Sequence, residues 1–171
     1  DISDLDSKHI IDVAEAYWHR GNEEQSDWGT CIDLLRLNIN HAKEQNFSND
    51  LVDGKKRIAD KLQQIGQFIE AEEILSEALS ETTVFGKDNR YANTLVDLIA
   101  CRISGDLSPK LSDAENQINE AIDIWRKYGH NKGLLSAIRT KIRLHIYRSE
   151  FDKAENEIQN GLRLYEDEYH P

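Results

Sequence analysis

The sequence predicts an all-α protein, built as an α-solenoid of about four antiparallel helix hairpins. Three observations support this fold class. Apolar residues recur at spacings of three and four along most of the chain, which is the period of an amphipathic helix. No stretch shows the sustained alternation that is typical of a strand. Similar segments return about every 40 residues, and such a period is typical of helical repeat proteins.

The composition indicates a folded chain with long helices. Of its 171 residues, 39% are hydrophobic and only two are proline. No apolar run is long enough to span a membrane and no signal segment opens the chain, so we expect a cytoplasmic protein with no membrane partner. The chain has no methionine and starts at Asp1. We therefore expect residues 1–171 to be a single domain that is a piece of a larger protein.

Small residues mark the second helix of each hairpin. They are Cys31, Ala71, Ala114 and Ala154, separated by 40, 43 and 40 positions, and each follows a turn residue (Gly21, Gly66, Gly105 and Ser149). Three of them have a small partner seven positions later (Ala78, Ala121 and Gly161), whereas the first unit has Asn38. Seven residues are two helical turns, so both small side chains face one neighbour and let the helix backbones approach closely. Cys31 and Cys101 both lie at apolar positions, which favours buried thiols over a disulfide.

The first two hairpins are predicted from their apolar stripes. The first repeat, 4–46, holds helices at about 4–20 and 28–45, and its stripe begins with Ile10, Val13, Ala14, Tyr17 and Trp18. The second repeat, 48–82, holds helices at about 50–65 and 68–81, with Ile58, Ala59, Leu62 and Ile65 on the first and Ala71, Ile74, Leu75, Ala78 and Leu79 on the second. Each hairpin has two apolar sides, and stacking against neighbours is the way to bury both.

The last two hairpins follow the same pattern. The third repeat, 87–129, holds helices at about 88–104 and 111–128, and "SPKLSDAE" predicts Ser112 as an N-cap with Glu115 completing a capping box. The fourth repeat, 131–168, holds helices at about 131–148 and 151–166, with Leu134, Leu135, Ile138, Ile142 and Ile146 as the stripe of the first. Units one and three carry an insertion of about four or five residues between their helices.

This pattern resembles the tetratricopeptide repeat. The residues that carry the resemblance are Ala59, Leu62, Gly66, Phe68, Glu70, Ala71, Leu75, Ala78 and Leu79 in the second unit, and Phe151, Ala154, Ile158 and Leu162 in the fourth. The period of about 40 and the segment 81–103 are similar to the longer repeats of the kinesin light chain type. Lys141 departs from the pattern because it stands where an apolar residue is expected. The resemblance implies a right-handed superhelix whose first helices line a concave groove that binds a protein or peptide.

No motif predicts catalysis, a cofactor or a metal site. The sequence contains no glycine-rich phosphate loop, HExxH, GxSxG or CxxC. The six histidines are scattered, and pairs of carboxylates such as Glu72 with Glu73 are typical of solvated helix faces. A net charge of −11 argues against nucleic acid as a partner, because phosphate binding needs a broad positive surface. We therefore expect a protein that is not an enzyme.

Positive charge gathers in residues 124–149. This stretch has no Asp or Glu and holds seven of the chain's 21 lysines and arginines (Arg126, Lys127, Lys132, Arg139, Lys141, Arg143 and Arg148). One interpretation is that acidic neighbours within the fold attract the stretch. The other is a ligand site, because Arg139, Arg143 and Tyr147 are spaced by four and share a helix face, and arginine holds carboxylates bidentately.

The resemblance extends the predicted groove to the other first helices. Its residues would be Lys8, Ile11, Glu15 and Trp18 in the first unit, Lys56, Asp60 and Gln63 in the second, Leu95, Ile99 and Arg102 in the third, and Arg139, Arg143 and Tyr147 in the fourth. Trp18 is equally consistent with a place in the core. The groove would be apolar and acidic at one end and basic at the other.

The sequence thus favours a non-catalytic interaction module that binds a protein or peptide, including one with an acidic segment. Two alternatives stay open. In the first, the chain is a ligand-sensing regulatory domain of a larger signalling or transcription-regulating protein. In the second, it is a scaffold that self-associates as a homodimer through its terminal repeats.

Overall fold

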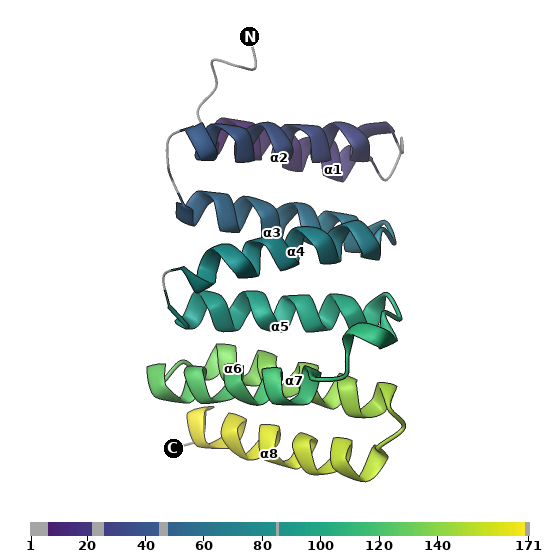
Figure 1. Ribbon diagram of the computed structural model, residues 1–171, viewed down its shortest axis with the longest axis vertical. Coiled ribbons are helices and arrows are strands. Elements are labelled where there is room, and N and C mark those ends of the chain that lie inside the picture. The colour runs from purple at the N-terminus through teal and green to yellow at the C-terminus, as the bar shows by residue number, and fades with distance from the viewer. Residues whose placement is uncertain (1–6, 22–25, 45–47, 85, 170–171) are drawn as a thin grey trace. The chain divides into compact units, whose positions relative to one another are not determined.

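The computed structural model describes residues 7–21, 26–44, 48–84 and 86–169 (Figure 1). This part of the chain forms eight α-helices and one short 3₁₀ helix, and it contains no β-strand. The predicted all-α fold class is therefore confirmed. No helix within these ranges is both long and apolar enough to cross a membrane.

In chain order, the helices are α1 (Ser7–Arg20), α2 (Ser26–Glu44), α3 (Ser48–Gln64), α4 (Phe68–Thr83), α5 (Asn89–Ser104), the 3₁₀ helix η2 (Ser108–Lys110), α6 (Ala114–Tyr128), α7 (Asn131–Tyr147) and α8 (Phe151–Tyr169). Each helix end lies within about three residues of its predicted position. The apolar period and the turn residues were therefore sufficient to locate all eight helices of the described ranges.

The chain divides into two compact units, Asp1–Ile74 and Leu75–Pro171, with the division inside α4. In the first unit α1 packs against α2, and α2 packs against α3. The core of this unit is made of the apolar stripes of these helices, and it includes Ile10, Ala14, Leu35, Ile58 and Leu62. Cys31 is a buried thiol, as the sequence predicted, and Asn38 is buried two turns further along α2.

In the second unit α5 packs against α6 and α7, and α7 in turn packs against α6 and α8 (Figure 1). Its core consists of the buried stripes of these helices, including Leu95, Ile99, Ile118, Ile122, Trp125, Ile138 and Leu144. The small residues Ala114, Ala121 and Ala154 are buried, and a Cβ added at Gly161 would lie 3.4 Å from Ile138. The close approach of helices that the small residues predicted is therefore present in this unit.

Side chains and turn conformations delimit the helices of the second unit. Asp88 caps α5 by accepting hydrogen bonds from the backbone N–H groups of Arg90 and Tyr91. The Nδ1 atom of His130 accepts from the N–H of Gly133 at 3.1 Å and caps α7. Ser149 takes the left-handed conformation, with φ of 59°, so that the chain can turn from α7 into α8.

The predicted capping box at the start of α6 is wrong. Helix α6 begins at Ala114, and its N-cap is Asp113 rather than Ser112. The side chain of Asp113 caps no backbone N–H and accepts from Asn116 instead, at 2.7 Å. The inserted residues form η2 and a turn before the helix, and the N-cap lies one position later than predicted.

Candidate functional site

The four lysines and arginines of α7 lie on two opposite faces of the helix. At about 100° per residue, Lys132, Arg139 and Arg143 fall on one side of the helix and Lys141 falls on the other. We call the first side, together with Tyr147, the Arg139 face. The two interpretations of this basic stretch therefore apply to different residues.

Lys141 and Arg148 meet carboxylates of neighbouring helices. The Nζ atom of Lys141 lies 2.7 Å from Oε1 of Glu157 in α8, and both side chains are mostly buried. Nη1 of Arg148 lies 3.3 Å from Oε2 of Glu115 in α6, and Nη2 donates to the carbonyl oxygen of Leu111 at 2.8 Å. For these two cations, attraction by acidic neighbours within the fold accounts for their place in the sequence.

The Arg139 face lies beside the end of α5. Nη2 of Arg143 donates to Oγ of Ser104 at 2.7 Å. The hydroxyl of Tyr147 donates to the carboxylate of Asp106, and this hydrogen bond raises the pKa of Tyr147. Arg139 is exposed and takes part in no ion pair among the described residues. Arg102 is half-buried near the same end of α5 and donates to the carbonyl oxygen of Lys110 at 3.4 Å.

The predicted groove residues of α1 are partly engaged in contacts within the first unit. Lys8 is exposed and Ile11 is half-buried. Glu15 accepts a hydrogen bond from Nζ of Lys61 in α3 at 2.8 Å, and this ammonium lies 4.6 Å from the centre of the Trp18 ring. Trp18 is only 8% exposed, so it belongs to the core rather than to an open groove.

The groove residues predicted on α3 have polar surroundings. Asp60 is exposed and accepts from the side chain of Gln64 at 2.7 Å, whereas Lys56 and Gln63 are half-buried.

Two groove residues predicted on α5 of the third unit lie in the core instead. Leu95 is 1% exposed and Ile99 is 0% exposed, so both are core residues and form no part of a binding surface. A first helix packs on more than one side, and the sequence did not show which apolar positions face inward.

A buried histidine between two carboxylates is a cluster that sequence reasoning missed. His145, 1% exposed, lies with Nδ1 at 2.7 Å from Oε2 of Glu150 and with Nε2 at 4.0 Å from Oε1 of Glu115. One ligand atom from each of the three residues lies within 4.8 Å of the others, a spacing that a metal ion could bridge. Glu115 and His145 are 30 positions apart in different hairpins, so no local motif could have indicated the cluster.

The charges around this cluster are balanced by the protein itself. Arg148 lies 3.3 Å from Glu115, and Nζ of Lys153 lies 3.2 Å from Glu150. The hydrogen bond with His145, assisted by Lys153, holds the pKa of Glu150 below its ordinary value of 4.5. A cation would have to displace these partners and reach a buried ring nitrogen. The cluster is therefore best described as a clamp that joins α6, α7 and the turn that leads into α8.

A cleft of about 490 Å³ lies in the second unit, on the side of α7 opposite the Arg139 face. Helices α6 and α8 form its walls, and its apolar lining comes from Ile122, Ile138 and Leu164. Three cations from three helices (Arg126, Lys141 and Arg163) and two carboxylates (Asp123 and Glu157) also line it. This cleft gathers more positive than negative side chains in a chain whose net charge is −11.

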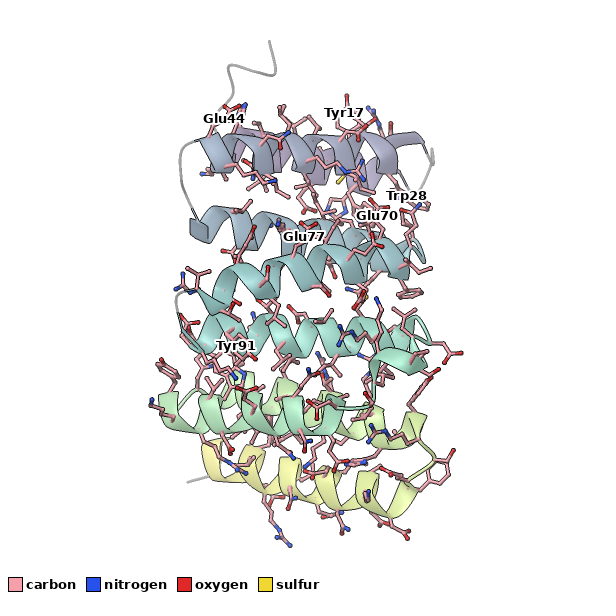
Figure 2. The ribbon with its side chains drawn as sticks, viewed as in Figure 1. Tyr17, Trp28, Glu44, Glu70, Glu77 and Tyr91 are labelled. Atoms are coloured by element: carbon pink, nitrogen blue, oxygen red, sulfur yellow. The ribbon has the colours of Figure 1, made fainter. Side chains whose placement is uncertain are left out.

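A second cleft, of about 570 Å³, lies in the first unit between α2, α3 and the start of α4. Trp28 at the start of α2 and Glu70 at the start of α4 both line it, and they lie near each other in Figure 2. Its cation, Arg36, lies 2.5 Å from Glu70 and 3.4 Å from Asp33. Two carboxylates thus already neutralise Arg36. This cleft is therefore a weaker candidate for binding an anion than the cleft of the second unit.

The fold and these sites define an all-helical protein with a basic helix face and a polar cleft. The sequence matches no family model, and a comparison with curated proteins found no relative.

Proposed function

We propose that this chain is a non-catalytic module of the tetratricopeptide type that binds an acidic segment of a partner protein. In this proposal the four hairpins stack as one right-handed solenoid, and their first helices line a common groove. The order of the helices and the buried small residues of the second unit support the repeat interpretation.

The observation that carries the proposal is the Arg139 face. Lys132, Arg139 and Arg143 share one side of α7, and that helix contributes no carboxylate to compete for them. Arg143 is held in place by Ser104, which reduces the side-chain entropy that it would lose on binding. A guanidinium holds a carboxylate through two parallel hydrogen bonds, so an acidic peptide is the ligand that this surface fits best.

The test is the affinity for a fluorescein-labelled peptide of Asp, Glu and Leu, measured by fluorescence anisotropy. We expect the double variant Arg139→Glu with Arg143→Glu to bind at least about tenfold more weakly, because each charged hydrogen bond contributes roughly 1.5–3 kcal/mol. The matched control, Lys43→Glu with Lys127→Glu, makes the same change in net charge at two exposed positions. Equal weakening by both pairs, or by neither, would contradict the proposal.

A second candidate function, self-association, is favoured by the outer surface of α8. Phe151, Ile158, Leu162 and Tyr165 fall on one side of this helix and are between 42% and 65% exposed. An apolar stripe of this kind is typical of an interaction surface, and burying it against a second copy of α8 would remove it from water.

For this candidate we expect a dimer by light scattering after size exclusion, and a monomer after Ile158→Lys with Leu162→Lys. The reason is that a buried ammonium group opposes the burial of the stripe. Asn156→Lys with Gln159→Lys adds the same two charges at exposed polar positions of α8 outside the stripe and should leave the dimer intact. A wild-type chain that is monomeric at every concentration would exclude this function.

A further inference from the structure

The cleft between α6 and α8 has a polar floor that the fold alone does not require. Lys141 and Glu157 form an ion pair there at 2.7 Å, with 14% and 18% of their side chains exposed. Removing such a pair from water costs free energy that its attraction often fails to recover, so an apolar pair would stabilise α7 and α8 at least as well. Lys141 stands at the position where the repeat pattern predicts an apolar residue.

The ion pair at the floor is electrically neutral. Burial by itself would raise the pKa of Glu157, but the hydrogen bond and the charge of Lys141 outweigh burial, and the pKa lies below its ordinary value. The second oxygen of Glu157 accepts from Asn160 at 3.5 Å. Glu157 is therefore occupied on both oxygens, and it offers little to an incoming cation.

The rim of the cleft carries positive charge that the neutral ion pair at the floor does not balance. Arg126 lies 3.5 Å from Asp123, but both side chains are more than half exposed, so water and salt weaken this pair. Arg163 lines the cleft from α8 and has no ion pair within the described ranges. The side-chain amides of Asn119 and Asn160 also line it and can donate hydrogen bonds.

We propose that this cleft binds a small organic anion through a carboxylate or phosphate group, with Arg126 and Arg163 as the residues that recognise the charge. The volume of about 490 Å³ lies in the range of ordinary small-molecule sites. Guanidinium groups from two helices can hold one oxyanion from both sides, while Ile122, Ile138 and Leu164 contact its carbon skeleton. The site is distinct from the Arg139 face, because it lies on the opposite side of α7.

This site would allow the chain to act as a ligand sensor, the regulatory alternative that the sequence left open. A bound anion would bridge α6 of the third hairpin and α8 of the fourth, so it would favour one angle between the two hairpins over others.

The experiment is a titration of the ¹⁵N-labelled chain with inorganic phosphate and, separately, with citrate, followed by amide chemical shifts. Sodium chloride keeps the ionic strength constant throughout, because screening alone also moves shifts. We expect saturable shifts confined to residues 119–126, 138–141 and 157–164. The probe that saturates at the lower concentration identifies the favoured group, phosphate or carboxylate.

Variants distinguish a site from unspecific attraction of anions. Arg126→Gln and Arg163→Gln each should weaken binding at least about tenfold, as expected for the loss of one charged hydrogen bond. The control Lys127→Gln removes the same charge at an exposed position of α6 that does not line the cleft, and it should leave the affinity unchanged. Three results would each overturn the proposal: no saturation by either probe, equal weakening in the control, or unchanged binding in both cleft variants. All three substitutions are at exposed positions, so the variants should fold.

Discussion

The variant His145→Ala is expected to lower the free energy of unfolding by about 2–3 kcal/mol. His145 is the one histidine among the buried residues described, and its side chain lies between Glu115 of α6 and Glu150 in the turn before α8. The substitution removes a buried ring, leaves a cavity, and deprives Glu150 of its nearest donor. Urea unfolding followed by circular dichroism measures the change.

A second variant, Lys153→Ala, distinguishes the effect of the buried His145 ring from the effect of losing a positive charge near Glu150. Lys153 is the other partner of Glu150, but its side chain is 55% exposed. Lys153→Ala should therefore leave the stability nearly unchanged. If both variants lose the same stability, the clamp does not depend on burial of His145. If neither loses any, the clamp does not stabilise the fold.

The difference in stability between the wild type and His145→Ala should depend on pH in a defined direction. Because the hydrogen bond with His145 holds the pKa of Glu150 below its ordinary value of 4.5, ionised Glu150 stabilises the folded state at pH values above 4.5. This contribution is lost as the pH falls through the lower pKa of the folded state. The difference in stability between the wild type and His145→Ala should therefore narrow as the pH falls below about 4.5.

The variant Leu95→Ala is expected to lower the free energy of unfolding by about 2–5 kcal/mol. Leu95 is 1% exposed and lies in the core of the second unit, so its truncation loses buried apolar surface and leaves a cavity. A residue that lined an open groove would lose far less. Chemical unfolding of this variant therefore distinguishes the core position from the groove position that the sequence suggested.

The control for Leu95→Ala is Ile146→Ala, a truncation of the same size on α7 of the same unit. Ile146 is 51% exposed, so its truncation should cost less than about 1 kcal/mol. A loss at Leu95 as small as the loss at Ile146 would show that the core of the second unit does not include Leu95.

The basic stretch, residues 124–149, shows which features of the candidate site could be predicted from the sequence and which could not. Its spacing correctly placed Arg139 and Arg143 on one side of a helix, since the period of 3.6 residues is a local property of the chain. The spacing could not say that Lys141 pairs with Glu157 or Arg148 with Glu115. Those partners come from other helices, and which carboxylate meets which cation depends on how the helices pack.

The sequence by itself determined where the helices lie along the chain and, in the second unit, the small residues at which helices approach closely, because apolar period, turn residues and side-chain size act over a few neighbouring residues. Only the tertiary structure decided that Trp18, Leu95 and Ile99 are core residues, that His145 lies between two carboxylates, and that a cleft opens between α6 and α8. Burial and charge pairing depend on residues of other helices, such as Glu157 of α8 for Lys141 and Glu115 of α6 for Arg148, and no local pattern records which of them come into contact.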